Sequence, residues 1–111
     1  MIFILAGINI DRAPVEVLEC VAVPTHELKS HLNRLATYAG GGVILSTCNR
    51  TEIYSVADDV EVGVRQLKEY IEAVPEHAGI KGIGEYVYTI TGDAVAEHLF
   101  GVTAGLKSVA L

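Results

Sequence analysis

The sequence predicts an α+β fold in which helices pack on one face of an antiparallel sheet. Short apolar runs rich in β-branched residues alternate along the chain with longer segments whose leucines and valines repeat every three or four residues. The chain has 111 residues, which suits a single domain. Of these residues 50% are hydrophobic and 20% are charged, a composition typical of globular proteins.

The first two expected elements are a strand and a helix. Residues 2–6 form a continuous apolar run that predicts a buried strand. Pro14 then restricts the residue before it, so we expect the segment that follows to stay out of helix for a few residues. Thr25 is a candidate N-cap for the first helix. The inward stripe of that helix is Leu28, Leu32, Leu35 and Ala39.

The middle of the chain predicts two neighbouring strands. Three glycines at residues 40–42 end the first helix. Residues 43–45 are too few and too apolar for a helix and predict a buried strand. Residues 53–57 predict its neighbour, so the polar residues 46–50 should lie at or near a turn between the two strands.

The last part of the chain predicts helix, strand and helix. Asp58 and Asp59 favour the positive N-terminal end of a second helix, which Pro75 should end. Its inward stripe is Val60, Val64, Leu67, Ile71 and Val74. Residues 76–85 read as a loop and residues 86–90 as a strand. A third helix begins at Gly92 and Asp93, with an inward stripe of Val95, Leu99, Val102 and Leu106.

This order of elements predicts a ferredoxin-like split β-α-β sandwich: an antiparallel sheet with helices on one face, plus a C-terminal helix. The last residue, Leu111, lies inside the third helical pattern with no stop signal, so we expect the sequence to be cut from a longer one. The fold by itself indicates no chemistry, because many functions use it.

Charge and cysteine content exclude several classes of protein. Fourteen acidic against eight basic residues give a net charge of −6. This charge argues against binding the phosphate backbone of a nucleic acid through overall electrostatic attraction. Two cysteines are too few for a disulfide scaffold. The apolar run at residues 2–6 is too short for a signal peptide or a membrane span. We therefore expect a cytoplasmic protein without a membrane partner.

The segment from Ser46 to Glu52 concentrates the reactive side chains. Cys48 follows an apolar strand and stands among hydroxyls, an amide, a guanidinium and a carboxylate. A nearby cation such as Arg50 would raise the fraction of reactive thiolate, or would bind a substrate carboxylate in a bidentate fork. Glu52 would hold Arg50 or the turn, or would simply be solvated. The alternative interpretation is a turn cysteine beside a solvated arginine.

The same segment carries a family resemblance. Residues 46–54, STCNRTEIY, resemble the nucleophile signature of glutamyl-tRNA reductases, which start tetrapyrrole (porphyrin) synthesis from glutamate. Residues 7–9 with 13–16 are similar to the family's N-terminal signature. A third signature is similar to residues 98–100, 104–106 and Ser108. The chain departs from the family pattern at Ile10, Asp11 and Arg12, where histidine, lysine and threonine are usual, and at Gly101, where arginine is usual.

The resemblance implies that residues 1–111 are the N-terminal catalytic domain of such an enzyme, without its NADPH-binding and dimerisation domains. It implies a Cys48 thiolate that attacks the ester joining glutamate to tRNA, and a glutamyl thioester that hydride from NADPH reduces to glutamate-1-semialdehyde. By itself the fragment would not carry out the reduction. A thioester accepts hydride far better than a carboxylate does, so covalent catalysis is chemically sensible.

The resemblance also implies the site residues and partners. Cys48 and His98 are the expected catalytic residues, with His98 polarising a carbonyl or handling a proton. The expected substrate contacts are Thr47, Cys48, Asn49, Arg50 and Ser108. The substrate is glutamyl-tRNA, the whole enzyme would be a homodimer, and the product would pass to glutamate-1-semialdehyde aminomutase.

Two rival functions remain open. One is a non-catalytic ferredoxin-like binding module in which Cys48 is incidental, and the other is a redox-sensing thiol domain. A redox-sensing domain needs a second cysteine near Cys48 that can form a disulfide with it. Cys20 is instead expected on a different element, as a small packed residue. No metal site is expected, since the histidines show no ligand spacing with the cysteines. Residues 79–84 lack the order of a dinucleotide fingerprint, and Tyr86 and Tyr88 are expected to pack.

Overall fold

The structure is a computed structural model that describes residues 1–73 and 82–104. The chain runs through four strands, four α-helices and two short 3-10 helices in these residues. In chain order they are β1 (Ile2–Asn9), α1 (Val15–Val21), η1 (Thr25–Glu27), α2 (Leu28–Tyr38), β2 (Val43–Ser46), β3 (Arg50–Ala57), α3 (Val60–Ala73), η2 (Ile83–Tyr86), β4 (Tyr88–Thr91) and α4 (Ala94–Thr103).

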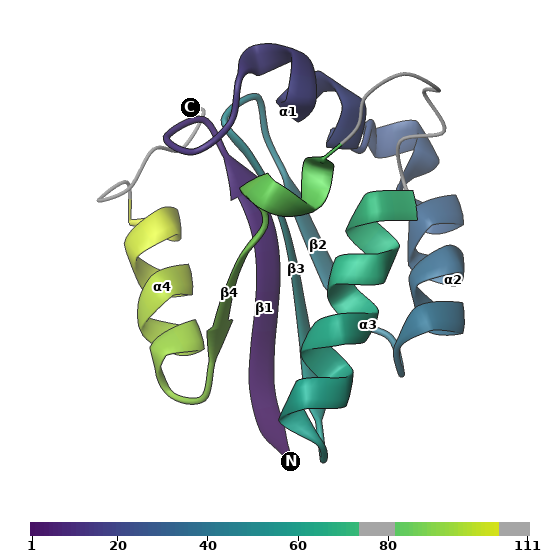
Figure 1. Cartoon of the computed structure of the whole chain (residues 1–111), viewed down its shortest axis with the longest axis vertical. Coiled ribbons are helices and arrows are strands. Elements are labelled where there is room, and N and C mark those ends of the chain that lie inside the picture. Colours follow the sequence, from purple (N-terminus) through teal and green to yellow (C-terminus); the bar gives the residue numbers. More distant parts are fainter. Residues whose placement is uncertain (74–81, 105–111) are drawn as a thin grey trace.

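The four strands form one antiparallel sheet in the order β2-β3-β1-β4. The long central pair, β1 and β3, is matched residue for residue from Ile2 opposite Ala57 to Asn9 opposite Arg50. Figure 1 shows this sheet between the pair α2 and α3 and the last helix, α4. The predicted ferredoxin-like arrangement of an antiparallel sheet with a C-terminal helix is confirmed.

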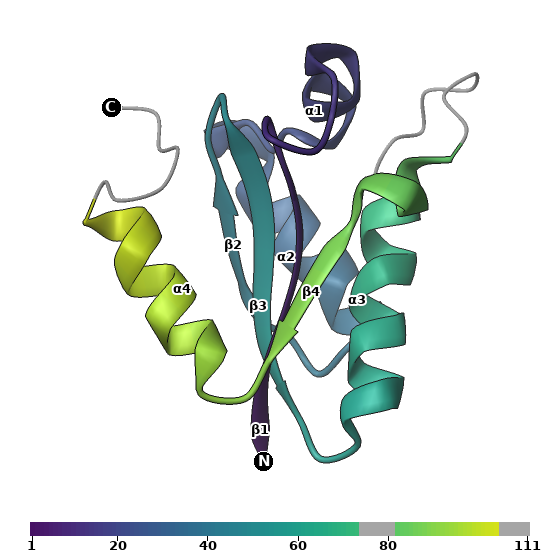
Figure 2. The same cartoon turned by 60° about the vertical axis from the view of Figure 1, so that its left-hand side comes forward.

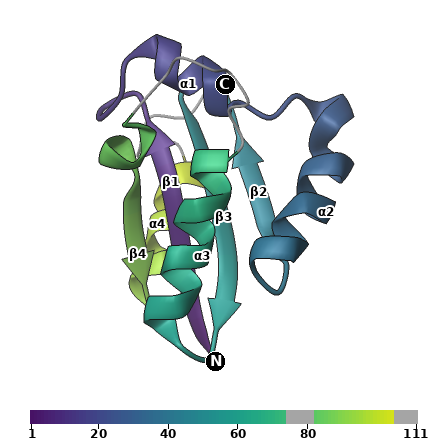
Figure 3. The same ribbon diagram turned by 45° about the vertical axis from the view of Figure 1, so that its right-hand side comes forward.

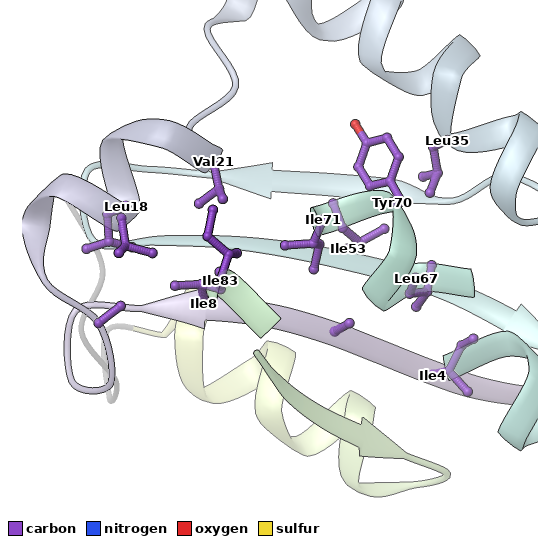
Figure 4. Close-up of a cluster of buried hydrophobic side chains, with 13 residues drawn as sticks. Ile4, Ile8, Leu18, Val21, Leu35, Ile53, Leu67, Tyr70, Ile71 and Ile83 are labelled. Carbon is purple, nitrogen blue, oxygen red and sulfur yellow. The ribbon is translucent and has the colours of Figure 1, made fainter. Parts of the chain in front are cut away.

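The helices divide between the two faces of the sheet. Helices α2 and α3 cover one face and α4 lies against the other, as Figures 2 and 3 show from two sides. Successive residues of β1 point to opposite faces, so Ile4, Ala6 and Ile8 join the core under α3 while Leu5 packs toward α4. Figure 4 shows the larger core, which includes Leu67 and Ile71 of α3.

The structure corrects the expectation that the chain stays out of helix after Pro14. Helix α1 begins directly after this proline, which is its N-cap with φ −62° and ψ 156°. The proline restricts the residue before it, but its own fixed φ suits the start of a helix. Val17, Leu18 and Val21 of α1 are buried and extend the larger core.

Other boundaries differ by a few residues. Thr25 begins a 3-10 turn, and α2 itself begins at Leu28 with no side-chain cap. Helix α3 begins at Val60, and the Asp59 carboxylate accepts the Val62 N–H at 3.2 Å, which satisfies one free donor of the first turn. Strand β4 begins at Tyr88 rather than at residue 86. Val74, Pro75, residues 76–81 and Leu106 lie outside the described residues.

Across residues 1–73 and 82–104, no helix combines the length and the apolar character needed to cross a membrane.

Candidate functional site

Glu52 lies at the centre of the site, on the third residue of β3. Alternation along the strand places Arg50, Glu52 and Tyr54 on one face of the sheet, the face toward α4. Strand β3 is paired on both sides, by β2 and by β1, and His98 of α4 reaches the Glu52 carboxylate from the covered face. The Glu52 side chain is 0% exposed. A carboxyl group buried to this degree needs compensating partners.

The residue between Glu52 and β4 has no side chain. Gly7 of β1 is paired with Glu52 on one side and with Tyr88 of β4 on the other. A Cβ on Gly7 would lie 2.8 Å from Glu52 Cγ and 3.0 Å from the Tyr88 hydroxyl. The Tyr88 hydroxyl therefore passes over Gly7 and donates a hydrogen bond to Glu52 Oε2.

Three further side chains bind the same carboxylate. The Tyr54 hydroxyl donates to Oε1 at 2.6 Å, and Arg50 Nη1 donates to Oε2 at 3.1 Å. His98 Nε2, from α4, lies 2.5 Å from Oε2. We call Glu52 and its four partners Arg50, Tyr54, Tyr88 and His98 the Glu52 cluster. Side chains from β3, β4 and α4 thus meet at one carboxylate.

The Glu52 cluster stabilises the ionised carboxylate. Burial alone raises the pKa of Glu52, but the hydrogen bonds from Tyr54, Tyr88 and His98 outweigh it and leave the pKa below the usual glutamate value. Burial and the hydrogen bond to Glu52 also raise the pKa of Tyr54 and of Tyr88 far above the ordinary tyrosine value. Both tyrosines therefore remain hydroxyl donors at neutral pH.

Cys48 lies two residues before Arg50, in the turn between β2 and β3, and its side chain is exposed. The turn is closed by the Thr47 N–H, which donates to the Arg50 carbonyl at 2.7 Å. Thr47 Oγ1 accepts the Asn49 N–H at 3.1 Å, and Cys48 Sγ lies 3.8 Å from Asn49 Oδ1. The sulfur is thus accessible to a reagent from outside.

The base of this turn is fixed to neighbouring segments. Ser46 Oγ and Thr51 Oγ1 lie 2.8 Å apart, and Ser46 Oγ accepts the Val23 N–H at 2.9 Å. On the other side, the Ile10 N–H donates to the Asn49 carbonyl at 2.9 Å. The turn is therefore held by β3, by the segment after α1 and by the segment after β1.

Arg12 belongs to the same segment after β1. Its guanidinium lies 5.5 Å from the centre of the Tyr88 ring, a cation–π contact. The segment that departs from the family pattern therefore contacts both the cysteine turn, through Ile10, and the Glu52 cluster, through Arg12.

The sequence-based expectations for the site have mixed outcomes. Arg50 and His98 are brought together on Glu52, whereas Thr47, Cys48 and Asn49 form the adjacent turn. Their roles in catalysis and substrate binding stay predictions, and Ser108 lies outside the described residues.

Two of the alternatives for this segment were wrong. Arg50 lies at the edge of the turn, as expected, where β3 begins, but its guanidinium is not solvated, because the residue is 1% exposed. Glu52 was allowed to be solvated, but it is buried and holds Arg50, the other role considered for it. The reason in both cases is that pairing with β1 reaches as far as residue 50.

The sequence interpretation missed the two tyrosines as members of the site. The alternation Arg50, Glu52, Tyr54 on one strand face was the available signal for Tyr54. Tyr88 packs as expected, but its role as a donor depends on the strand register and on Gly7. Only the role of Tyr88 was unreadable before the register of the strands was known.

The remaining candidates lie apart from the cluster. Cys20 is half-buried on α1, as expected for a small packed residue. His31 is buried on α2, where Nδ1 lies 3.0 Å from the Tyr70 hydroxyl. In the part of the chain that the structure describes, no three His, Cys, Asp or Glu side chains are placed to hold a metal ion.

An apolar groove adjoins the cluster on the same face of the sheet. It runs between α4 and strands β2 and β3 and shares Tyr54 with the cluster. Its walls include the exposed side chains of Phe3, Val43, Val56 and Leu99.

Comparisons with a family model, with curated proteins and with solved structures all point to the same family. Residues 6–111 match the family model of the glutamyl-tRNAGlu reductase N-terminal domain. Curated glutamyl-tRNA reductases from Carboxydothermus hydrogenoformans and Geobacillus thermodenitrificans are 38% and 39% identical over the whole chain, which spans 25% of each relative. The solved structure of glutamyl-tRNA reductase from Methanopyrus kandleri matches 96% of this chain and 23% of its own, with 26% identity and a TM-score of 0.63.

Proposed function

Because the chain belongs to the family of glutamyl-tRNA reductase N-terminal domains, we propose that it is the domain that takes the glutamyl group from glutamyl-tRNA. The chain spans about a quarter of the length of the curated relatives that it matches. The activity proposed for the whole protein is reduction of glutamyl-tRNA to glutamate-1-semialdehyde at the start of porphyrin synthesis.

The proposed step in this domain is transfer of the acyl group to sulfur. The Cys48 thiolate attacks the carbonyl carbon of the ester, a C–S bond forms, and the bond to the tRNA 3′ oxygen breaks. The leaving oxygen takes a proton, which His98 would supply. Arg50 would bind the glutamate carboxylate, and Thr47, Asn49 and Ser108 would contact the glutamyl group.

The supporting observation is an exposed thiol two residues before the first member of a buried charged cluster. Cys48 is accessible in its turn, while Arg50, two residues later, and His98 share one carboxylate. A site of this kind offers an exposed thiol in a turn that leads into a fixed, buried arrangement of donors. Groups that are already fixed in position lower the entropic cost of bringing reactants and catalytic groups together.

The described residues do not fit NADPH. None of the three connections from strand to helix, residues 10–14, 58–59 and 92–93, carries the three-glycine pattern that binds a dinucleotide. We therefore propose that the reduction by NADPH takes place in the whole enzyme and not in this chain alone. A homodimer, transfer of the product to glutamate-1-semialdehyde aminomutase, and a cytoplasmic location are proposed for the whole enzyme in the same way.

The acyl-transfer proposal is tested with glutamyl-tRNA carrying radiolabelled glutamate. We expect label on the protein that neutral hydroxylamine removes, as it does from a thioester. Cys48→Ser should abolish this label, and Cys20→Ser is the matched control that should keep it. Label that persists in Cys48→Ser would show another acceptor, and absence of label on the unchanged chain would favour the binding module.

A further inference from the structure

We propose that Glu52 is a positioning residue that keeps a proton on Nε2 of His98 and so makes Nδ1 the nitrogen that exchanges protons at the site. The inference about the ring follows from the Glu52 cluster alone. Its consequence for acyl transfer rests on the proposed function.

The first step concerns the carboxylate. Glu52 is 0% exposed and receives Arg50 Nη1 at 3.1 Å, so an ionised Glu52 is paired with a fixed positive charge. An ionised carboxylate only accepts hydrogen bonds and has no proton to offer. Each group that faces it must therefore donate.

The second step concerns the histidine ring. His98 Nε2 lies 2.5 Å from Glu52 Oε2, the oxygen that also accepts from Arg50 and Tyr88. Nε2 must therefore carry a hydrogen in both the neutral and the charged ring. In the neutral ring the lone pair is then on Nδ1, so this nitrogen gains and loses the exchangeable proton.

The third step concerns orientation. His98 is on α4 and Glu52 on β3, 46 residues apart in the chain, and the His98 side chain is 11% exposed. Tyr88 flanks the ring, with the two ring centres 6.0 Å apart. With Nε2 held at the carboxylate and one face beside Tyr88, the direction of Nδ1 is fixed as well. A positioned carboxylate that orients a histidine is a common arrangement in acid–base catalysis.

The direct test is long-range proton–nitrogen NMR of the chain labelled with 15N-histidine, which distinguishes a nitrogen that carries a proton from one that does not. In the neutral ring, we expect His98 Nε2 to be protonated and Nδ1 unprotonated. The resonances are assigned by their loss in His98→Gln. A ring with its proton on Nδ1 in the unchanged chain would overturn the proposal, and this measurement needs no folded variant of Glu52.

Glu52→Gln tests the cause. The glutamine amide both accepts and donates, so the ring should no longer be restricted to one tautomer, and the two nitrogen shifts should move toward each other. Tyr54→Phe is the matched control, because it removes a bond at Oε1 and leaves the His98 contact at Oε2. His31 is the internal reference. An unchanged His98 tautomer in a folded Glu52→Gln would overturn the proposal.

The kinetic consequence is measured by the rate at which Cys48 takes the glutamyl group. Loss of an oriented proton-transfer group typically costs about 100-fold or more in rate, so we expect Glu52→Gln to slow acylation by about this factor while tRNA binding is preserved. Failure of the unchanged chain to accept a glutamyl group would defeat the proposed function and leave the NMR result intact. An unslowed Glu52→Gln would defeat the positioning role and leave Cys48 as the acceptor.

Discussion

Gly7 faces Glu52 across the central strand pair so closely that a Cβ on the glycine would lie 2.8 Å from Glu52 Cγ. The same Cβ would lie 3.0 Å from the Tyr88 hydroxyl. Such contacts are shorter than side chains tolerate in a packed interior. The buried carboxylate and its tyrosine partner therefore depend on the absence of a side chain at this position.

Gly7→Ala is expected to lower the free energy of unfolding by about 1–3 kcal/mol, the usual cost of overpacking a core. The methyl group must displace Glu52 or Tyr88 or push β1 from β3. Urea denaturation of the two proteins measures the difference. Gly40→Ala is the matched control, since a Cβ there has no neighbour within 4 Å. Equal unfolding midpoints for Gly7→Ala and the unchanged chain would contradict the close approach.

Acid is expected to destabilise the chain partly through Glu52. The pKa of this carboxyl is lower in the folded chain than the ordinary value of 4.5. Its contribution to stability is therefore complete above that ordinary value and is lost as the pH falls through the lowered, folded value. Unfolding by urea between pH 7 and pH 2 should show this loss in the unchanged chain.

Glu52→Gln isolates this contribution because a glutamine does not titrate. The difference in stability between the two proteins is expected to be constant above the ordinary glutamate pKa and to shrink at lower pH. A difference that stays the same down to pH 2 would mean that Glu52 is not preferentially ionised in the folded chain.

The buried pair of His31 and Tyr70 links α2 to α3 and gives a separate pH effect. Burial lowers the pKa of His31 below its ordinary value of 6.5, with Arg34 adding to the effect. The folded chain thus favours the neutral ring, and the corresponding stability is lost as the pH falls below 6.5 toward the folded value. An NMR titration of His31 with a midpoint at or above 6.5 would contradict this.

The pKa of Tyr70 is shifted in the opposite direction to that of His31. Burial raises its pKa to about 12. Its hydroxyl therefore stays protonated through neutral pH, and the stability that this provides is lost only as the pH rises above the ordinary tyrosine range.

The two cysteines are expected to differ in their rates of alkylation. Cys48 is exposed and Cys20 is half-buried on α1. Iodoacetamide should therefore modify Cys48 first, as mass spectrometry of digested samples taken over time would show. Cys48→Ser should change the free energy of unfolding by less than about 0.5 kcal/mol, as for other exposed positions. Faster modification of Cys20 would mean that the turn does not present its sulfur.

The apolar patterns of the sequence were sufficient for the fold. The stripes at Leu35 and Leu67 place α2 and α3 on the sheet, and the continuous apolar run in β1 explains why both of its faces are covered. Helix α1 was missed because Pro14 was considered only for its effect on the preceding residue. Its effect on its own φ starts the helix.

The site was predictable in part. The reactive segment and its cysteine were visible as polar residues after an apolar strand, and His98 was visible beside a helical stripe. The role of Glu52 was not, because a carboxylate in a polar segment looks solvated until strand pairing is known. The contact between residues 52 and 98 joins two elements that nothing in the local sequence connects.

The short segment after β1 couples the turn that carries Cys48 to the Glu52 cluster. Ile10 holds one side of the hairpin tip through the Asn49 carbonyl, and Arg12 rests on the Tyr88 ring. A displacement of this segment would therefore reach both the turn that carries Cys48 and the Glu52 cluster. A substitution of Arg12 would therefore act first on the Tyr88 ring, and one that shifts the backbone at Ile10 would act first on the hairpin tip.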